Sequence, residues 1–170
     1  DVLGADGGVE RALKKLDSIK DHVIWWTKGA QTPQLLADGE VVIGSTYNGR
    51  LFSLIEEEKQ NVGMLWDWQV FDLDGWIIPK GTKNLAAVKK FVRFATDTQR
   101  LADQAKFISY GPARKSSAPL VSKHATLGID MKPHMPTDPN NAKTTLLYNY
   151  EFWADHQDDF TQRFQAWLAK

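Results

Sequence analysis

The sequence predicts an α/β fold, and two observations support this class. Segments whose apolar residues recur at helical spacing alternate along the chain with short segments rich in β-branched residues. The resulting order of helix, strand, helix, strand, strand and helices is typical of α/β proteins. The chain has 170 residues, of which 42% are hydrophobic and 25% charged, so we expect one globular domain or two small ones.

The first helix is predicted over residues 9–21, where apolar side chains recur every three or four residues. The short apolar run at residues 22–26 fits either a strand or the end of a helix. A second, shorter helix is expected to begin at Pro33, because proline is tolerated in a first helical turn. It is expected to end at Gly39, because glycine favours the end of a helix.

Three segments have the composition of strands. They are short, rich in β-branched or aromatic residues, and bounded by glycine or proline. A turn at Asn48–Gly49 follows the first of them and leads into a helix over residues 51–61. The three predicted strands cover residues 40–46, 61–68 and 72–79.

The second half of the chain is predicted to be mainly helical. Residues 84–107 form the clearest helical region, with a break near Thr96–Gln99. Residues 108–145 are rich in glycine, proline and asparagine and predict loops with short helices. From Leu146 to the end we expect two helices. Three short strands make a thin sheet for so many helices, which indicates that part of the fold lies outside this sequence.

Charge and composition exclude several classes of function. The chain has 21 basic and 21 acidic residues and no basic block, so no nucleic acid partner is expected. Cysteine is absent, which excludes thiolate metal sites and thiol catalysis and is compatible with an oxidising compartment. No apolar run approaches the roughly 18 residues of a membrane span. No leader opens the sequence, so we expect that it was removed or that the protein begins elsewhere.

Two carboxylates, Asp72 and Asp74, stand in the apolar stretch WDWQVFDLDGWIIP. Their spacing places both on the same side of a strand. This pattern fits a solvated edge strand, a metal site, the acid pair of a hydrolase, or a site for an organic cation. A metal would need further oxygen or histidine ligands, and the four histidines are scattered without ligand spacing, so no metal and no cofactor are predicted.

The aromatic residues near the two acids favour an organic cation. An ammonium group is held by charge-assisted hydrogen bonds to a carboxylate, and aromatic faces accommodate both its charge and its methylenes. Tyr47 ends the first predicted strand, and Tyr110 lies in the loop SYGP. Both positions are junctions of the kind at which open α/β sheets bind ligands, although an aromatic residue there more often belongs to the core.

Three motifs resemble one known family. LLADGEVVIGSTYNGR, DLDGWIIPKGTKNLAAVKKFVRFAT and ISYGPARKSS are similar to the periplasmic spermidine/putrescine-binding proteins of ABC transporters, over most of residues 29 to 120. The resemblance implies the C-terminal half of a two-lobed periplasmic-binding-protein clamshell of type II. It places residues 1–73 in lobe two, residues 74–117 in lobe one after a hinge strand, and residues 118–170 back in lobe two with C-terminal helices.

The resemblance also implies ligand-binding residues. Asp74 matches the family acid that binds an amine, and Tyr47 falls where the family has a tryptophan that packs on the polyamine. Asp72 falls where many members have another aromatic residue, so the sequence departs from the pattern there. The remaining expected contacts are Tyr110 at the cleft rim, Asn149 as a C-terminal amide, and Gln31 in a loop that reaches the cleft.

The expected function is that of a solute-binding subunit which captures a polyamine or related amino compound, without catalysis. The alternatives are the same fold carrying another solute, such as an amino-acid derivative or an opine, a hydrolase using the two acids, and an interaction module without ligand. The expected partners are a cationic small molecule, an ABC permease and the missing N-terminal half of the protein. The expected location is the periplasm, or the cell exterior with a lipid anchor.

Overall fold

The computed structural model describes residues 2–170. Their contacts fall into two compact units, which are described separately. The first unit contains residues up to Trp26 together with Asn149–Lys170, and the second contains Thr27–Tyr148. The expected lobe boundaries near residues 73 and 117 stay predictions.

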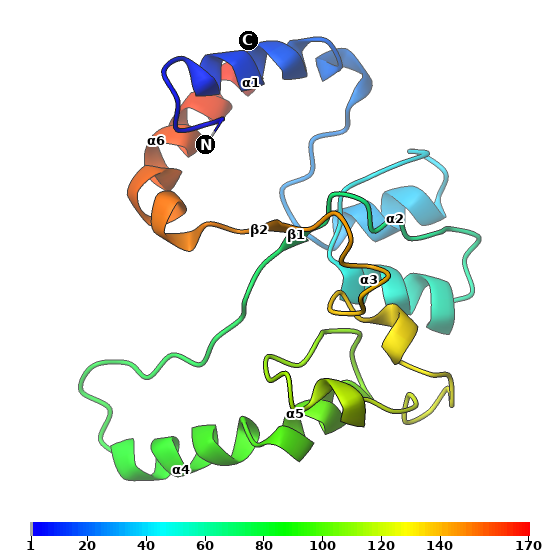
Figure 1. The fold of residues 1–170 in the computed structure, drawn as a ribbon. Helices are drawn as coiled ribbons and strands as arrows, with labels where there is room; N and C mark the ends of the chain where they lie inside the picture. Colours follow the sequence, from blue (N-terminus) through cyan, green and yellow to red (C-terminus); the bar gives the residue numbers. More distant parts are fainter. Residues whose placement is uncertain (1) are drawn as a thin grey trace. The chain divides into compact units, whose positions relative to one another are not determined.

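The first unit is built on helices α1 (Gly8–Asp17) and α6 (Tyr150–Leu168), which lie side by side (Figure 1). The indole Nε1 of Trp167 donates a 2.6 Å hydrogen bond to the carboxylate of Asp17. The ammonium of Lys20, in the short helix η1 (Lys20–His22), donates to the backbone carbonyl of Trp167 at 2.8 Å. Trp167 is therefore one of the residues that join the N-terminal and C-terminal segments of this unit.

The C-terminal segment differs from its prediction, because one helix replaces the expected two. Helix α6 runs unbroken for 19 residues from its N-cap at Asn149. The side-chain oxygen of Asn149 accepts the N–H of Phe152 at 3.1 Å, which satisfies one of the free donors of the first turn. No glycine or proline interrupts the helix after that cap, so nothing in the backbone ends it before Leu168.

The second unit begins with helix α2 (Gln31–Ala37) and helix α3 (Asn48–Phe52), which continues into the π-helical turn η2 (Ser53–Glu57). The helix predicted after the Asn48–Gly49 turn is thus confirmed. Its Phe52 is only 2% exposed and lies in the core of this unit. The other members of that core are Ala105, Val121, Met131 and Met135, with Leu127 and Ile129 packed against them.

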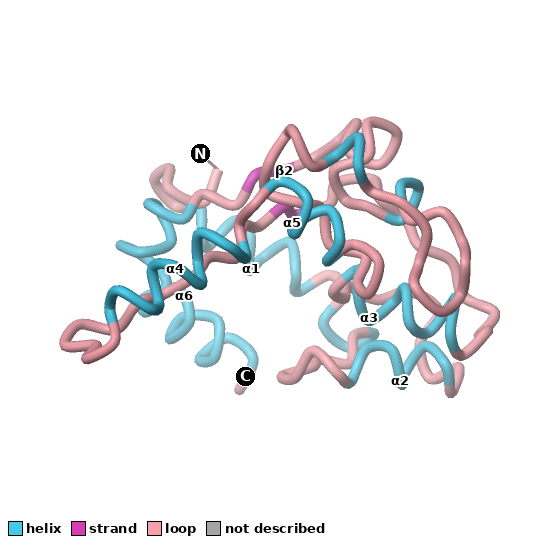
Figure 2. Tube along the Cα trace, turned by 90° about the horizontal axis from the view of Figure 1, so that it is seen from below, coloured by secondary structure: helices cyan, strands magenta, loops and turns pink. Residues whose placement is uncertain are grey.

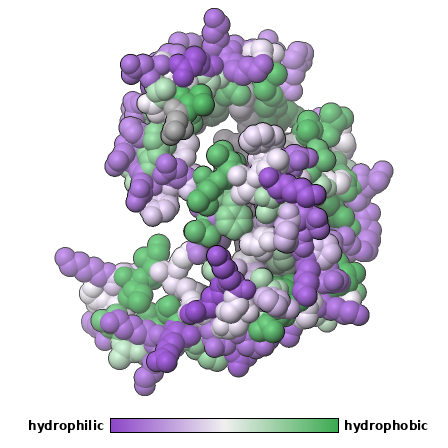
Figure 3. Space-filling model, viewed as in Figure 1, coloured by the Kyte–Doolittle hydropathy of each residue, from purple (hydrophilic) through white to green (hydrophobic). Residues whose placement is uncertain are grey.

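Helices α4 (Leu85–Ala95) and α5 (Thr98–Gln104) confirm the predicted helical region and its break. The break follows from the Asp97 cap, whose carboxylate accepts the N–H of Gln99 at 2.9 Å and so begins a new helix. Helix α4 buries none of its residues, and apolar surface extends over it (Figure 3). Two short turns, η3 (Ala118–Leu120) and η4 (Lys132–His134), follow in the predicted loop region.

The sheet is much smaller than predicted. In residues 2–170 it consists of two strands (Figure 2), β1 (Val70–Phe71) paired in parallel with β2 (Leu146–Leu147). Val70 lies opposite Leu146. None of the predicted strands at 40–46, 61–68 and 72–79 is paired, and these three predictions are wrong for this structure.

The unpaired segments keep the composition of strands but lack neighbours. A strand needs the N–H and C=O groups of an adjacent segment, so composition alone does not make one. Val42, Leu65 and Ile77 are 99%, 78% and 87% exposed, which shows that these segments bury little of their apolar surface. None of the described helices combines the length and apolar character needed to cross a membrane.

Candidate functional site

The turn after Tyr47 brings two of the predicted site segments together. The side-chain amide of Asn48 donates a 2.5 Å hydrogen bond to the backbone carbonyl of Ser109. A Cβ atom on Gly49 would lie 2.8 Å from Cε1 of Tyr110, so the Tyr110 ring rests on the backbone of Gly49. The loop SYGP and the start of helix α3 therefore form one surface, and the ligand-binding role expected for Tyr47 and Tyr110 stays a prediction.

The side chain of Tyr47 packs on a second glycine, Gly29. A Cβ atom on Gly29 would lie 2.6 Å from Cε2 of Tyr47 and 3.5 Å from Nε of Arg50. Both side chains thus lie over the Gly29 backbone, one helical turn apart at the start of α3. Tyr47 is 56% exposed, so its ring is available to a ligand from solvent. Below, Gly29, Tyr47, Gly49, Arg50 and Tyr110 are called the tyrosine site.

Gln31 lies next to the tyrosine site, and its side chain makes hydrogen bonds within the protein. Its side-chain oxygen accepts the N–H of Thr27 at 2.9 Å and that of Lys28 at 2.8 Å. These two bonds hold the loop that carries Gly29 against the start of α2. The carbonyl oxygen of Gln31 is therefore occupied, which leaves its amide nitrogen as the group that can face a ligand.

Two buried hydroxyls near the site have no hydrogen-bond partner in the described part of the chain. They belong to Thr32, which is 2% exposed, and to Thr46, the residue before Tyr47. A Cβ atom on Gly44 would lie 2.8 Å from Cγ2 of Thr32, so the segment before Tyr47 packs closely on α2. Buried polar atoms are nearly always paired, and an ordered water can serve as the partner of such a hydroxyl.

Arg50 is the site residue that the sequence reasoning missed. Its guanidinium has no ion pair among residues 2–170. It borders a cavity of about 270 Å³ that is also lined by Ser53, Glu58 and residues of α2. The signal was present in the motif TYNGR, because an arginine three residues after an aromatic ring lies on the same helical face.

The two predicted carboxylates differ in their bonding. Asp72 uses its carboxylate to accept the N–H of Leu73 at 2.8 Å, which ties it to its own backbone. Asp74 makes no hydrogen bond or ion pair with another described residue. No bond within residues 2–170 joins either carboxylate to the tyrosine site, and both side chains are exposed. Of the two, Asp74 is the acid that is free to take an ammonium.

The remaining predicted contact, Asn149, belongs to the other compact unit. Its side-chain oxygen caps helix α6, so only its amide nitrogen is unengaged. Its role in a ligand site stays a prediction. Across residues 2–170, no group of three or more histidine, aspartate or glutamate side chains could hold a metal ion.

Solved structures define the class of this fold. The chain superposes with a TM-score of 0.78 on an ABC transporter substrate-binding protein from Bradyrhizobium japonicum, at 29% identity, covering 94% of this chain and 48% of that one. It superposes with a TM-score of 0.74 on a GABA receptor, at 33% identity, covering 95% of this chain and 48% of the other. The fold is that of about half of a periplasmic binding protein, which confirms the predicted fold class.

Sequence comparison identifies the family. The family model described as bacterial extracellular solute-binding protein matches residues 1–137. The chain belongs to this family. It is also 37% identical over 169 residues to the gamma-aminobutyric acid-binding protein of Pseudomonas aeruginosa, covering 99% of this chain and 46% of that protein. The chain therefore spans about half the length of the curated relative it matches.

Proposed function

We propose that this chain forms part of a solute-binding subunit that captures a small amino compound bearing both an ammonium and a carboxylate. The observation that carries this proposal is the placement of Tyr47 and Arg50 together over Gly29, with Tyr110 on the adjoining Gly49. The site thus offers aromatic faces and an unpaired guanidinium on one exposed surface. This arrangement suits a ligand with one apolar and one anionic part.

Arg50 is assigned to the carboxylate of the ligand. A guanidinium presents parallel N–H donors that match the two oxygens of a carboxylate. Ser53, whose hydroxyl is a further donor to an anion, also lines the cavity beside Arg50. Glu58 lines the same cavity without an ion pair in the described chain, which leaves Arg50 available to a ligand.

Asp74 and the tyrosine rings are assigned to the ammonium end. Asp74 has a free carboxylate, and ring faces such as that of Tyr47 attract a cation within about 6 Å of their centre. Asp74 lies on a segment without regular structure. We therefore assign its contact with the ligand to the complete protein. Asp72 is assigned a lesser part, because its carboxylate is held by Leu73.

A zwitterion is favoured over the polyamine expected from the sequence. A diamine carries two positive charges, and Arg50 beside the rings would repel one of them. The names of the curated relative and of the GABA receptor also point to an amino acid with a terminal ammonium. This ligand class corresponds to the alternative reading of the sequence, in which the same fold carries an amino-acid derivative.

The delivery step and the location complete the proposal. Family membership supports a protein that works outside the cytoplasmic membrane, in the periplasm or on a lipid anchor, and passes its ligand to an ABC permease. No chemical step is proposed. We expect a purified full-length protein to hydrolyse neither glycosides nor esters, and turnover that disappears in Asp72→Asn would contradict the proposal.

Titration calorimetry of the full-length protein tests the ligand class. GABA is expected to bind more tightly than putrescine and than butyrate, which lacks the ammonium. Arg50→Gln should weaken GABA binding by about 2–5 kcal/mol, the scale for removing one partner of a desolvated charge pair. The matched control is Arg93→Gln on helix α4, which should leave the affinity unchanged. Tighter binding of putrescine, or an Arg50→Gln variant with unchanged GABA affinity, would overturn the zwitterion assignment.

A further inference from the structure

We propose that a surface of the second unit rich in lysine and arginine docks on the anionic phospholipid headgroups of a membrane. The surface consists of Lys89, Lys90 and Arg93 on helix α4 together with Arg114 and Lys115, and is called the basic surface below. The inference uses the proposed location outside the cytoplasmic membrane but not the proposed ligand. Vesicle binding and ligand binding can therefore fail separately.

The basic residues of the chain are unevenly distributed. Residues 80–115 contain nine basic and two acidic residues, whereas the rest of the chain contains 12 basic and 19 acidic residues. The formal net charge of +0 hides this difference, and no contiguous run marks it because the lysines and arginines stand singly or in pairs. A local excess of one sign attracts partners of the other sign even when the whole chain is neutral.

Both acidic residues of this segment are already engaged. The carboxylate of Asp97 accepts the N–H of Gln99 and caps helix α5. The carboxylate of Asp103 pairs with Lys106 at 2.8 Å and with Arg100 at 3.8 Å. The other basic residues of the segment have no ion pair with any described residue, and all of them are exposed. They are Lys80, Lys83, Lys89, Lys90, Arg93, Arg114 and Lys115.

Three of these charges share one side of helix α4. Because each helical residue turns the chain by about 100°, Lys89, Lys90 and Arg93 fall within a sector of about 100°. Ala86 is the remaining residue of that sector, and α4 contains no acidic residue. Apolar residues occupy the other sides of the helix. A helix of this kind packs with its apolar side and turns its charged side outward, so the three charges are accessible together.

Hydrogen bonds join this helix to the segment that carries the other two charges. Nε of Arg114 donates to the carbonyl of Thr96, directly after α4. The hydroxyl of Ser117 donates to the carbonyl of Thr98 at 2.7 Å. These two bonds hold the segment with Lys115 against the junction of α4 and α5. The terminal N–H groups of Arg114 make no hydrogen bond within residues 2–170, so they can face an anion.

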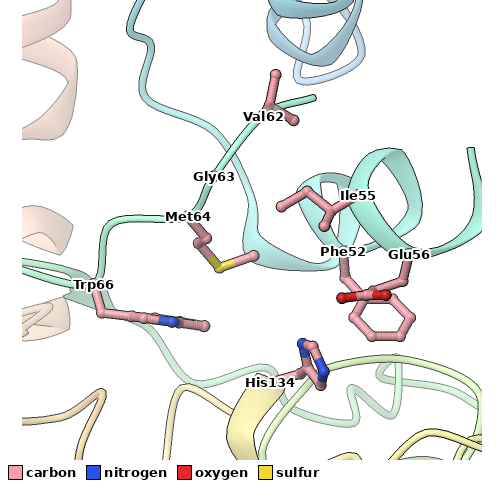
Figure 4. A pocket seen from close by; sticks show the side chains of 8 residues that line it. All are labelled: Phe52, Ile55, Glu56, Val62, Gly63, Met64, Trp66 and His134. Carbon is pink, nitrogen blue, oxygen red and sulfur yellow. The ribbon is translucent and has the colours of Figure 1, made fainter. Parts of the chain in front are cut away.

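The acidic residues of the second unit gather in another segment. Residues 27–74 contain eight acidic and three basic residues. One of the acidic residues, Glu56, lines a cavity of about 200 Å³ together with Phe52 and His134 (Figure 4), and it pairs with Lys59 at 3.3 Å. No ion pair among residues 2–170 joins these acids to the basic surface. The charge of the basic surface is thus left for an external partner.

The composition of residues 80–115 favours a membrane surface over a folded acidic protein. Six of the nine basic residues are lysines, whose compact charges stand on flexible stems and need no fixed partner geometry. A lipid surface offers negative charges without fixed geometry, and it attracts clusters of about 4–8 lysines and arginines. Each basic residue near such a surface strengthens binding by about fivefold. The proposed delivery to an ABC permease also takes place at a membrane.

Vesicle flotation with the full-length, unlipidated protein tests the proposal. The protein should bind vesicles that contain phosphatidylglycerol and should not bind vesicles of phosphatidylcholine alone. About 0.5 M sodium chloride should release it, because salt screens charges at a surface. Lys89→Gln, Lys90→Gln and Arg93→Gln combined should lower the partition coefficient by on the order of a hundredfold. Absence of binding to the anionic vesicles, or equal binding to both kinds, would overturn the proposal.

A second triple variant is the matched control. Lys14→Gln, Lys15→Gln and Lys143→Gln remove the same amount of charge from exposed positions outside residues 80–115, and should change the partition coefficient little. Both triple variants should keep the melting temperature of the unmodified protein, because none of the six side chains has an ion pair among residues 2–170. An equal loss of binding in both variants would show that total charge governs it, against the proposal. Binding confined to vesicles that contain the ABC permease would assign the basic surface to an acidic protein instead.

Discussion

The ring of Tyr110 rests on the backbone of Gly49, where a Cβ atom would stand 2.8 Å from Cε1 of the ring. This contact sets the distance between the SYGP loop and the start of helix α3. Since Asn48 also bonds to the carbonyl of Ser109, the two segments are held by one polar and one apolar contact.

Gly49→Ala is therefore expected to displace the Tyr110 ring and to weaken ligand binding. Forcing an extra methyl into a close contact typically costs about 1–3 kcal/mol of stability, so the melting temperature should fall as well. Gly63→Ala is the matched control, because a Cβ atom at Gly63 would meet nothing within 4 Å. Equal affinities and melting temperatures for Gly49→Ala and Gly63→Ala would show that the ring is free to move.

The two carboxylates are expected to behave differently in the full-length protein. Asp74→Ala should weaken binding of the amino ligand by about 2–5 kcal/mol, the scale for breaking a buried charge pair. Asp72→Ala should have a smaller effect, because its carboxylate serves the N–H of Leu73. Calorimetry on both variants decides the point. Unchanged affinity in Asp74→Ala would show that Asp74 does not contact the ligand. Tight binding of a simple anion would show that the ligand needs no ammonium group.

Trp167 should be important for the stability of the first unit. Trp167→Phe keeps an aromatic ring against Trp25 but loses the hydrogen bond to Asp17. Because hydrogen bonds to charged groups contribute about 1.5–3 kcal/mol, the free energy of unfolding in urea should fall by that amount. A double-mutant cycle with Asp17→Ala isolates the bond. Additive effects of the two substitutions would show that the bond contributes no stability.

Acid should weaken helix α5 through Asp103. Hydrogen bonds from Lys106 and then from Gln99 hold the pKa of the Asp103 carboxyl below its ordinary value. A pKa lower in the folded state than in the unfolded state means that the stabilisation is present above the unfolded pKa. It is lost as the pH falls through the folded pKa.

Melting curves measured from pH 6 down to pH 2 test this direction. Asp103→Asn should reduce the loss of melting temperature in acid, by a small amount because the group is exposed. Asp155→Asn on helix α6 is a control acid in the other unit. If Asp103→Asn made the acid dependence steeper, the assigned sign would be wrong.

The isolated chain is expected to self-associate. The chain exposes 12659 Å² of solvent-accessible surface. Two compact monomeric domains that share the mass of one chain would expose about 10,000 Å² together. Ile77, Phe91 and Phe94 are 87%, 52% and 57% exposed and form part of this excess. Residues 1–170 expressed alone should elute above their mass of 19.2 kDa and bind a hydrophobic dye. A monomeric, cooperatively melting 19.2 kDa species would refute the expectation that another segment covers this surface.

The helices could be predicted from the sequence because their bonds are local. The spacing of apolar residues predicted α1 and α4, and the break predicted near Thr96–Gln99 lies where Asp97 caps α5. The strands could not be assigned from composition, since pairing depends on residues distant in the chain or outside it. β1 and β2 are short and were not predicted at all, because only their mutual register distinguishes them from loop.

The two tyrosines of the candidate site were named from the sequence, and their role in ligand binding stays a prediction. Tyr47 and Tyr110 stand at chain junctions, and the structure brings their segments together through Gly49. Arg50 was missed because an arginine after a glycine turn has the composition of an ordinary exposed helix. Its significance comes from Gly29, which is distant in sequence and brings the guanidinium beside the Tyr47 ring.

The order of synthesis gives the bond between Asp17 and Trp167 a further consequence. These two residues are separated by 150 positions, so helix α1 leaves the ribosome long before the partner that covers it. In contrast, helices α4 and α5 are neighbours and can dock at once. Contacts between distant residues form late because the intervening chain must first be closed into a loop. During translation, α1 therefore lacks this partner until Trp167 has been synthesised, and a ribosome stalled before Trp167 would leave its apolar face uncovered.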